Sequence, residues 1–113
     1  MEVERWRSQL WKGAAELAIL ALLERRESYG LQLLDEVRGR EGLGLSEGTI
    51  YPLLNRLQKE GKLASSWVED PGASHPRKYY RLTGDGRALL QAMKSEWGAF
   101  RRSLTDLIEG ERT

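Results

Sequence analysis

The 113-residue chain contains no cysteine and only one histidine. Without cysteine, neither a disulfide framework nor a thiolate metal site can form. No cluster of residues has the spacing of a metal site, no glycine-rich phosphate loop follows a strand, and no two carboxylates are paired for acid–base catalysis. We therefore expect a protein that is not an enzyme and that carries no metal and no cofactor.

Long apolar runs are missing as well. The longest, residues 17–23, is far shorter than the ~20 residues needed to cross a bilayer. The first ten residues carry Glu2, Glu4, Arg5 and Arg7, a charge pattern unlike that of a secretory signal. These features predict a cytoplasmic protein without a membrane partner.

The net charge of +1 hides an uneven distribution along the chain. Residues 50–81 hold six basic and three acidic residues, an excess that can neutralise phosphate groups locally. The same pattern is typical of ordinary solvated charges, and charge alone does not separate the two interpretations.

Three helices followed by a hairpin are predicted in the first 82 residues. The first helix, residues 4–26, is apolar nearly all the way round its middle, so it must be covered on more than one side. Ser28 is expected to cap a second helix, residues 29–40, and Ser46 a third, residues 47–60. Strand-forming runs at 62–68 and 77–82 flank a linker with two prolines and a glycine, which predicts a hairpin with a long tip. Tyr80 and Leu82 are expected to face inward, and Trp67, in the first wing strand, is expected to be a packing residue.

A final helix is predicted to begin at Thr83, its N-cap. Its apolar residues recur at gaps of three and four, which is a heptad seam. The seam consists of Leu90, Met93, Trp97, Phe100, Leu104 and Leu107. We expect a second copy of this helix, with the spare face of the first helix, to cover the seam, because an exposed patch of this size is unfavourable. Folding back onto the protomer's own core is the alternative.

This order of elements indicates a winged helix-turn-helix, a mainly α (α+β) fold with a two-stranded wing. Residues 1–82 are predicted to form the DNA-binding domain and residues 83–113 a C-terminal dimerisation helix. In such a fold the third helix enters the major groove and the wing reaches the backbone or the minor groove.

The polar residues of these elements suit contacts with DNA. Asn55 and Arg56 can form bidentate hydrogen bonds with adenine and guanine edges, or bind phosphate. Lys59 is either a phosphate contact or a solvated charge, and His75 either faces DNA or is an inert surface residue. The candidate DNA-contacting residues are Tyr29, Ser46, Thr49, Tyr51, Asn55, Arg56, Lys59, His75, Arg77 and Lys78.

Two longer motifs resemble those of the PadR family of transcriptional regulators. The segment Ser46–Leu57, followed by Gly61, resembles the family's recognition-helix signature, and residues 77–83, followed by Gly86, resemble its wing-and-exit motif. Residues 17–23 and 28–30 resemble its opening helices, so the resemblance covers residues 10–105. The single C-terminal helix is similar to that of the short subfamily. The resemblance implies a homodimer, usually a repressor, that binds imperfect inverted repeats in double-stranded DNA.

The resemblance also implies a small-molecule site. Some short members hold planar aromatic compounds between paired tryptophans of the C-terminal helix, and Trp97 occupies that place here. The pocket residues implied are Leu10, Gly13, Ala14, Leu17, Met93, Trp97, Phe100 and Arg101. Arg101 departs from the acidic residues found near this tryptophan in drug-binding members, which puts a preference for cationic compounds in doubt. A tryptophan at a seam position is more often part of a plain dimer core than an effector platform, and the sequence leaves both interpretations open.

The sequence thus predicts a sequence-specific DNA-binding regulator, a repressor released by an effector bound at the dimer interface. Its two recognition helices are expected to lie about 34 Å apart, one turn of DNA. The alternative is a winged-helix dimer that acts through protein contacts without binding DNA. Glu16, the only acidic residue in the apolar stretch of the first helix, has no partner for catalysis.

Overall fold

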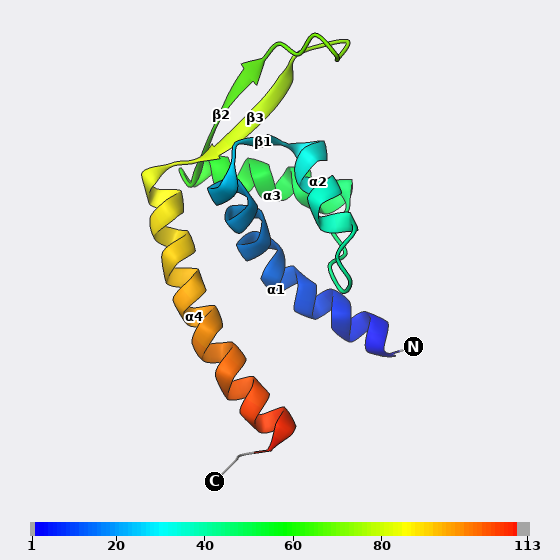
Figure 1. Ribbon diagram of the computed structural model, residues 1–113, viewed down its shortest axis with the longest axis vertical. Coiled ribbons are helices and arrows are strands. Elements are labelled where there is room, and N and C mark those ends of the chain that lie inside the picture. The colour runs from blue at the N-terminus through cyan, green and yellow to red at the C-terminus, as the bar shows by residue number, and fades with distance from the viewer. Residues whose placement is uncertain (1, 111–113) are drawn as a thin grey trace.

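The protein, described here from a computed structural model over residues 2–110, has four helices and three strands. In chain order these are α1 (Glu2–Arg25), β1 (Ser28–Tyr29), α2 (Gly30–Arg38), α3 (Glu47–Lys59), β2 (Leu63–Val68), β3 (Arg77–Leu82) and α4 (Gly84–Glu109) (Figure 1). The predicted order of helices and hairpin is confirmed, and the predicted fold class, a mainly helical winged helix-turn-helix, is correct. None of the described helices is long and apolar enough to cross a membrane.

The small sheet has three antiparallel strands in the order β1-β3-β2, not the two strands predicted. The extra strand is Ser28–Tyr29, which pairs with Tyr80 and Tyr79 of β3. Ser28 is therefore not the cap of α2, and that prediction was wrong because the residue is committed to the sheet and buried. Tyr29 takes the cap position, and its backbone N–H donates a hydrogen bond to Oε1 of Gln32 at 3.3 Å.

The apolar core lies where the first three helices meet the base of the hairpin. Ile19 and Leu20 of α1 are fully buried there, and Tyr80 and Leu82 of β3 face inward as predicted. Leu90 of α4 is also fully buried in this core. Leu90 therefore packs α4 against its own protomer. The prediction that Leu90 belongs to a seam between subunits was wrong for this residue.

The start of α4 is held by Thr83, as predicted. Its Oγ1 accepts a hydrogen bond from the N–H of Gly86 at 3.0 Å and donates one to the carbonyl oxygen of Gly61 at 2.6 Å. Gly86 is buried, and a side chain at this position would overlap the carbonyl oxygen of Lys62. The close approach at Gly86 thus fixes how α4 leaves the base of the hairpin.

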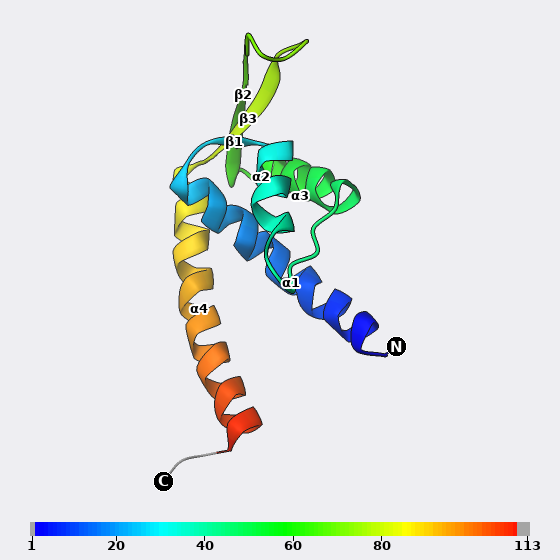
Figure 2. The same cartoon turned by 45° about the vertical axis from the view of Figure 1, so that its right-hand side comes forward.

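Two arms extend from the core and make the molecule elongated, with dimensions of 58 × 35 × 21 Å. The radius of gyration is 16.3 Å, whereas a compact domain of this length has a value of about 13 Å. The β2–β3 hairpin projects beyond the helices at one end, and α4 projects at the other (Figures 1 and 2). α1 and α4 lie side by side near the hairpin and diverge toward the two chain ends.

Candidate nucleic-acid interface

Helix α3 divides cleanly into an apolar face and a polar face. The buried residues are Ile50, Leu53, Leu54 and Leu57. The predicted DNA contacts on this helix are all exposed: Thr49, Tyr51, Asn55, Arg56 and Lys59. At about 3.6 residues per turn, Asn55 and Lys59 lie opposite the buried face, while Tyr51 and Arg56 lie on its two flanks. The centre of the exposed face therefore belongs to Asn55 and Lys59.

Ser46 and Thr49 lie together at the N-terminus of α3. Their hydroxyl oxygens are 3.3 Å apart, and the carbonyl oxygen of Ser46 accepts hydrogen bonds from the N–H groups of Thr49 and Ile50. Ser46 occupies the cap position as predicted, but its side chain bonds the neighbouring hydroxyl and does not cap a backbone N–H. Both hydroxyls remain exposed beside the start of the helix.

Arg56 lies on the flank that faces α1. Its Nη2 is 3.1 Å from Oε1 of Glu16, and its Nη1 is 3.2 Å from Oε1 of Glu60. Burial lowers the pKa of Arg56, but the hydrogen bonds and charges of Glu16 and Glu60 outweigh this, so the pKa lies above its ordinary value. The predicted base-reading arginine is therefore paired with two carboxylates in the free protein.

Tyr51, on the opposite flank of α3, packs against Gly30 at the start of α2. A Cβ added to Gly30 would lie 2.5 Å from Cε1 of Tyr51, so only glycine leaves room for the ring. Burial, with a smaller contribution from Tyr51, raises the pKa of Tyr80. The Tyr51 ring therefore forms part of the surface between α3 and the wing.

The two wing cations are held by aromatic rings. The guanidinium of Arg77 lies 4.3 Å from the centre of the Tyr29 ring, which contacts Tyr79 edge-on at 5.3 Å between ring centres. Arg77 also pairs with Oδ2 of Asp70 at 3.3 Å, and Nζ of Lys78 lies 5.5 Å from the centre of the Tyr80 ring. Each such contact contributes about 0.5–1 kcal/mol where it is open to solvent, so the rings favour these positions of the two cations.

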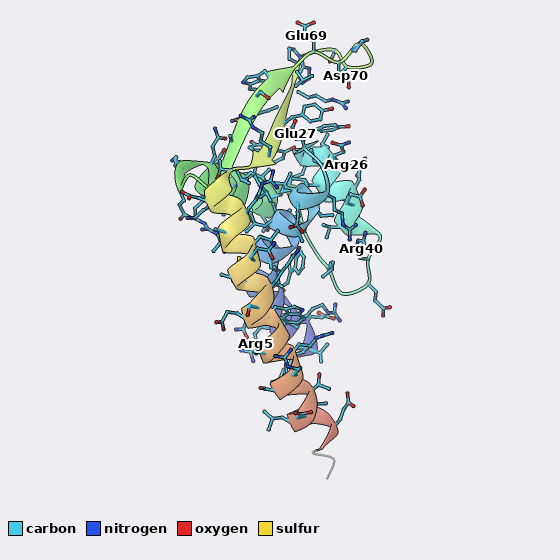
Figure 3. All side chains as sticks on the ribbon, turned by 60° about the vertical axis from the view of Figure 1, so that its left-hand side comes forward. Arg5, Arg26, Glu27, Arg40, Glu69 and Asp70 are labelled. Carbon is cyan, nitrogen blue, oxygen red and sulfur yellow. The ribbon has the colours of Figure 1, made fainter. Side chains whose placement is uncertain are left out.

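The tip end of the wing carries charges of both signs. Glu69 and Asp70 lie at the far end of the hairpin (Figure 3). His75 is exposed on the same loop, where its Nδ1 lies 3.0 Å from Oγ of Ser74. Arg77 and Lys78 begin β3 directly after this loop, and Arg77 pairs with Asp70, so acidic and basic groups lie side by side at the tip end of the wing.

A groove of about 600 Å³ runs between the wing and the helices. It brings together five predicted residues: Tyr29, Tyr51, His75, Arg77 and Lys78. Trp67 also lines it and is 69% exposed, so the prediction that Trp67 is a packing residue was wrong. Strand alternation does point Trp67 toward the inner face, but the wing projects past the core there and nothing covers the ring.

A second groove, of about 740 Å³, lies between α1 and α4. Seven of the eight predicted effector-site residues line it: Leu10, Gly13, Ala14, Leu17, Met93, Trp97 and Phe100. Arg101 lies outside this groove, and Glu96, which the sequence interpretation missed, lines it beside Trp97. Glu96 therefore places an acidic side chain in the wall of this groove. The rings of Trp97 and Phe100 lie 5.8 Å apart.

The outer half of α4 has no cover within the described residues. From Lys94 onward no side chain of the helix is buried. The exposed apolar residues are Trp97, Phe100, Leu104, Leu107 and Ile108. Among residues 2–110, no group of histidine and carboxylate side chains is arranged to hold a metal ion.

The fold and the exposed α3 face define a winged helix-turn-helix protein, and comparison with known proteins gives the family. Residues 19–92 match the transcriptional regulator PadR-like family. The transcriptional regulator Rv3488 of Mycobacterium tuberculosis is 38% identical over 79 residues, which are 70% of this chain and 71% of that protein.

Solved structures give the same family. A PadR-like transcriptional regulator from Bacillus cereus superposes with a TM-score of 0.82 at 34% identity, over 91% of this chain and 99% of the other. A PadR family regulator from Eggerthella lenta superposes with a TM-score of 0.81 at 33% identity, over 96% of this chain and 94% of the other. The chain belongs to the PadR-like family and is a transcriptional regulator.

Proposed function

We propose that this regulator binds duplex DNA as a homodimer at inverted-repeat operators. The observation that carries the proposal is the exposed polar face of α3, centred on Asn55 and Lys59 and flanked by a wing in which Arg77 and Lys78 lie against tyrosine rings. In this arrangement α3 enters the major groove, and the wing lies against the backbone or the minor groove.

The homodimer in this proposal is formed through α4. Five large apolar side chains on its outer half are exposed in the protomer, and a patch of this kind is typical of a protein interface. A second α4, together with the N-terminal half of the partner's α1, covers that stripe. The two α3 helices then face the same side of the duplex, about 34 Å apart.

The regulator acts as a repressor that a planar aromatic compound releases. The α1–α4 groove supports this part of the proposal, because its volume of about 740 Å³ lies within the range of about 300–1,000 Å³ typical of small-molecule sites. Trp97 and Phe100 provide flat apolar surfaces, and Glu96 favours a cationic ring system. A compound bound there changes the angle between α1 and α4, and with it the spacing of the α3 helices.

Electrophoretic mobility shifts with the DNA upstream of the chain's own gene test the proposal. We expect the wild-type protein to shift this duplex, and the Asn55→Ala variant to bind it about 5- to 150-fold more weakly, the loss of one bidentate base contact. A planar aromatic cation should weaken the wild-type complex. A dimer that shifts neither this duplex nor a mixed-sequence one would contradict the proposal and favour regulation through protein contacts.

A further inference from the structure

The side chain of Glu16 reaches from α1 to the DNA-facing helix. Its Oε1 lies 3.1 Å from Nη2 of Arg56, a residue 40 positions further along the chain. Nη1 of the same guanidinium contacts both carboxylate oxygens of Glu60, at 3.2 and 3.3 Å. One cation is therefore shared between a carboxylate of its own helix and a carboxylate of a different element.

The position of Glu16 in α1 is unfavourable unless the carboxylate has a partner. It is the only acidic residue between Ala14 and Leu23, and its side chain is only 28% exposed. Its neighbours Ala15 and Ile19 are buried in the core. Since a partly buried carboxylate loses hydration, the guanidinium of Arg56 is the group that compensates it.

The charge of this cluster opposes contact with DNA. Two carboxylates contact this one guanidinium, so the charge of Arg56 is already compensated before DNA approaches. For Arg56 to bind a phosphate or a base edge, its Nη2 must leave Glu16, and that carboxylate is then unpaired near a polyanion. Asn55 and Lys59, which lie at the centre of the exposed face, carry no such restriction.

We propose that Glu16 is a positioning residue that withholds Arg56 from DNA. In the wild-type protein α3 then reads DNA mainly through the centre of its exposed face, and Arg56 contributes little to affinity. Keeping a flexible cation away from phosphates lowers binding to unrelated sequences, so Glu16 increases the ratio of operator binding to non-specific binding. This inference depends on the proposed DNA-binding function.

The Glu16→Gln substitution tests the inference, because it removes the charge and keeps the shape of the side chain. Using a mixed-sequence duplex, we expect Glu16→Gln to bind about two- to fivefold more tightly than wild type, the fold-change that corresponds to releasing one exposed ion pair. Its plot of log affinity against log salt should be steeper by about one unit, since one more phosphate is neutralised. The ratio of operator to mixed-sequence affinity should fall.

A double variant separates an effect through Arg56 from a general effect of charge. In the Arg56→Ala background, Glu16→Gln should leave DNA affinity unchanged, because the cation that it releases is absent. Glu41→Gln is the matched control, since it removes an exposed acidic residue in the turn before α3. It should leave the salt slope as in wild type.

Three results would overturn the inference. One is a Glu16→Gln variant that binds no more tightly than wild type. Another is a gain that persists without Arg56, and the third is an equal gain in Glu41→Gln. A wild-type protein that binds no duplex would instead reject the proposed function. Thermal unfolding of both single variants and the double variant shows independently whether the pair forms, since paired residues give non-additive shifts.

Discussion

At the scale of single residues, the cations on the candidate DNA surface are distinguished by their neighbours. Arg77 and Lys78 lie against tyrosine rings, which leave their charges uncompensated apart from the contact of Arg77 with Asp70. Arg56 instead shares its charge with two carboxylates. The wing cations are therefore more available to bind phosphate than the arginine on α3.

Lys78→Ala should weaken binding to operator and mixed-sequence duplexes alike, because a phosphate contact carries no sequence information. We expect the slope of log affinity against log salt to become shallower by about one unit. Fluorescence anisotropy over a salt series measures this slope. Arg101→Ala, on α4 and away from the wing, is the control and should keep the wild-type slope. An unchanged slope in Lys78→Ala would contradict a phosphate contact at this position.

A carboxylate on α1 also ties this helix to α4. Oε1 of Glu24 lies 2.6 Å from Nζ of Lys94, and its Oε2 accepts a hydrogen bond from Gln91 at 3.2 Å. The hydrogen bond from Lys94 is the main cause of a pKa of Glu24 below its usual range. A lowered pKa in the folded state stabilises the fold at neutral pH, and this contribution is lost as the pH falls through that pKa.

We therefore expect Glu24→Gln to lower the melting temperature at neutral pH and to have no effect in acid, where Glu24 of the wild type is protonated. Differential scanning fluorimetry across a pH series measures the difference between the two proteins. Lys94→Gln should show the same pH dependence, because it removes the other partner. A difference that stays constant from neutral to acidic pH would show that the pair does not act through its charge.

At the scale of elements, local patterns predicted the helices and the hairpin well. Helix α3 is signalled by its apolar spacing, and the hairpin by the proline-containing linker between β2 and β3. α3 and both strands begin and end within one residue of prediction. β1 has no such signal, because two residues become a strand only when β3 offers them a partner. The pairing of Glu16 with Arg56 also has no local signal, since the two residues are 40 positions apart and only the folded chain brings them together.

The junction between the wing and α4 depends on a close backbone approach. Gly86→Ala should destabilise the fold by about 1–3 kcal/mol or more, because the added methyl group overlaps the carbonyl oxygen of Lys62 and must displace backbone. Chemical denaturation measures the loss. Gly84→Ala, in the same turn, has open space around the new Cβ and should be neutral or slightly stabilising. Equal stability of the two variants would contradict this geometry.

At the scale of the whole molecule, the protomer is incomplete on one side. The heptad seam in the sequence predicted the apolar stripe of α4, and the structure divides it into two parts. Leu90 belongs to the protomer's own core, Met93 is half-buried, and the residues from Trp97 onward are exposed. The extent of each part depends on where α1 and α4 diverge, which a periodic pattern does not specify.

Phe100→Glu should convert the dimer to a monomer at micromolar concentration, because it places a charge within the apolar stripe. The protomer should stay folded, since Phe100 is 51% exposed and outside the core. Size-exclusion chromatography with light scattering measures the mass, and circular dichroism checks the helix content. Ser95→Glu lies on the opposite face of α4 at about 3.6 residues per turn and should remain a dimer. A dimeric Phe100→Glu would place the interface elsewhere.

Two chains are expected to bind one duplex, and the mass of the protein–DNA complex tests this most directly. Sedimentation velocity of the wild-type protein with the duplex upstream of its gene, at micromolar concentration, gives that mass. We predict a complex of two chains and one duplex, formed from a dimer that is present before DNA is added. A complex of one chain and one duplex, from a monomer with α4 folded onto its own core, would contradict this account.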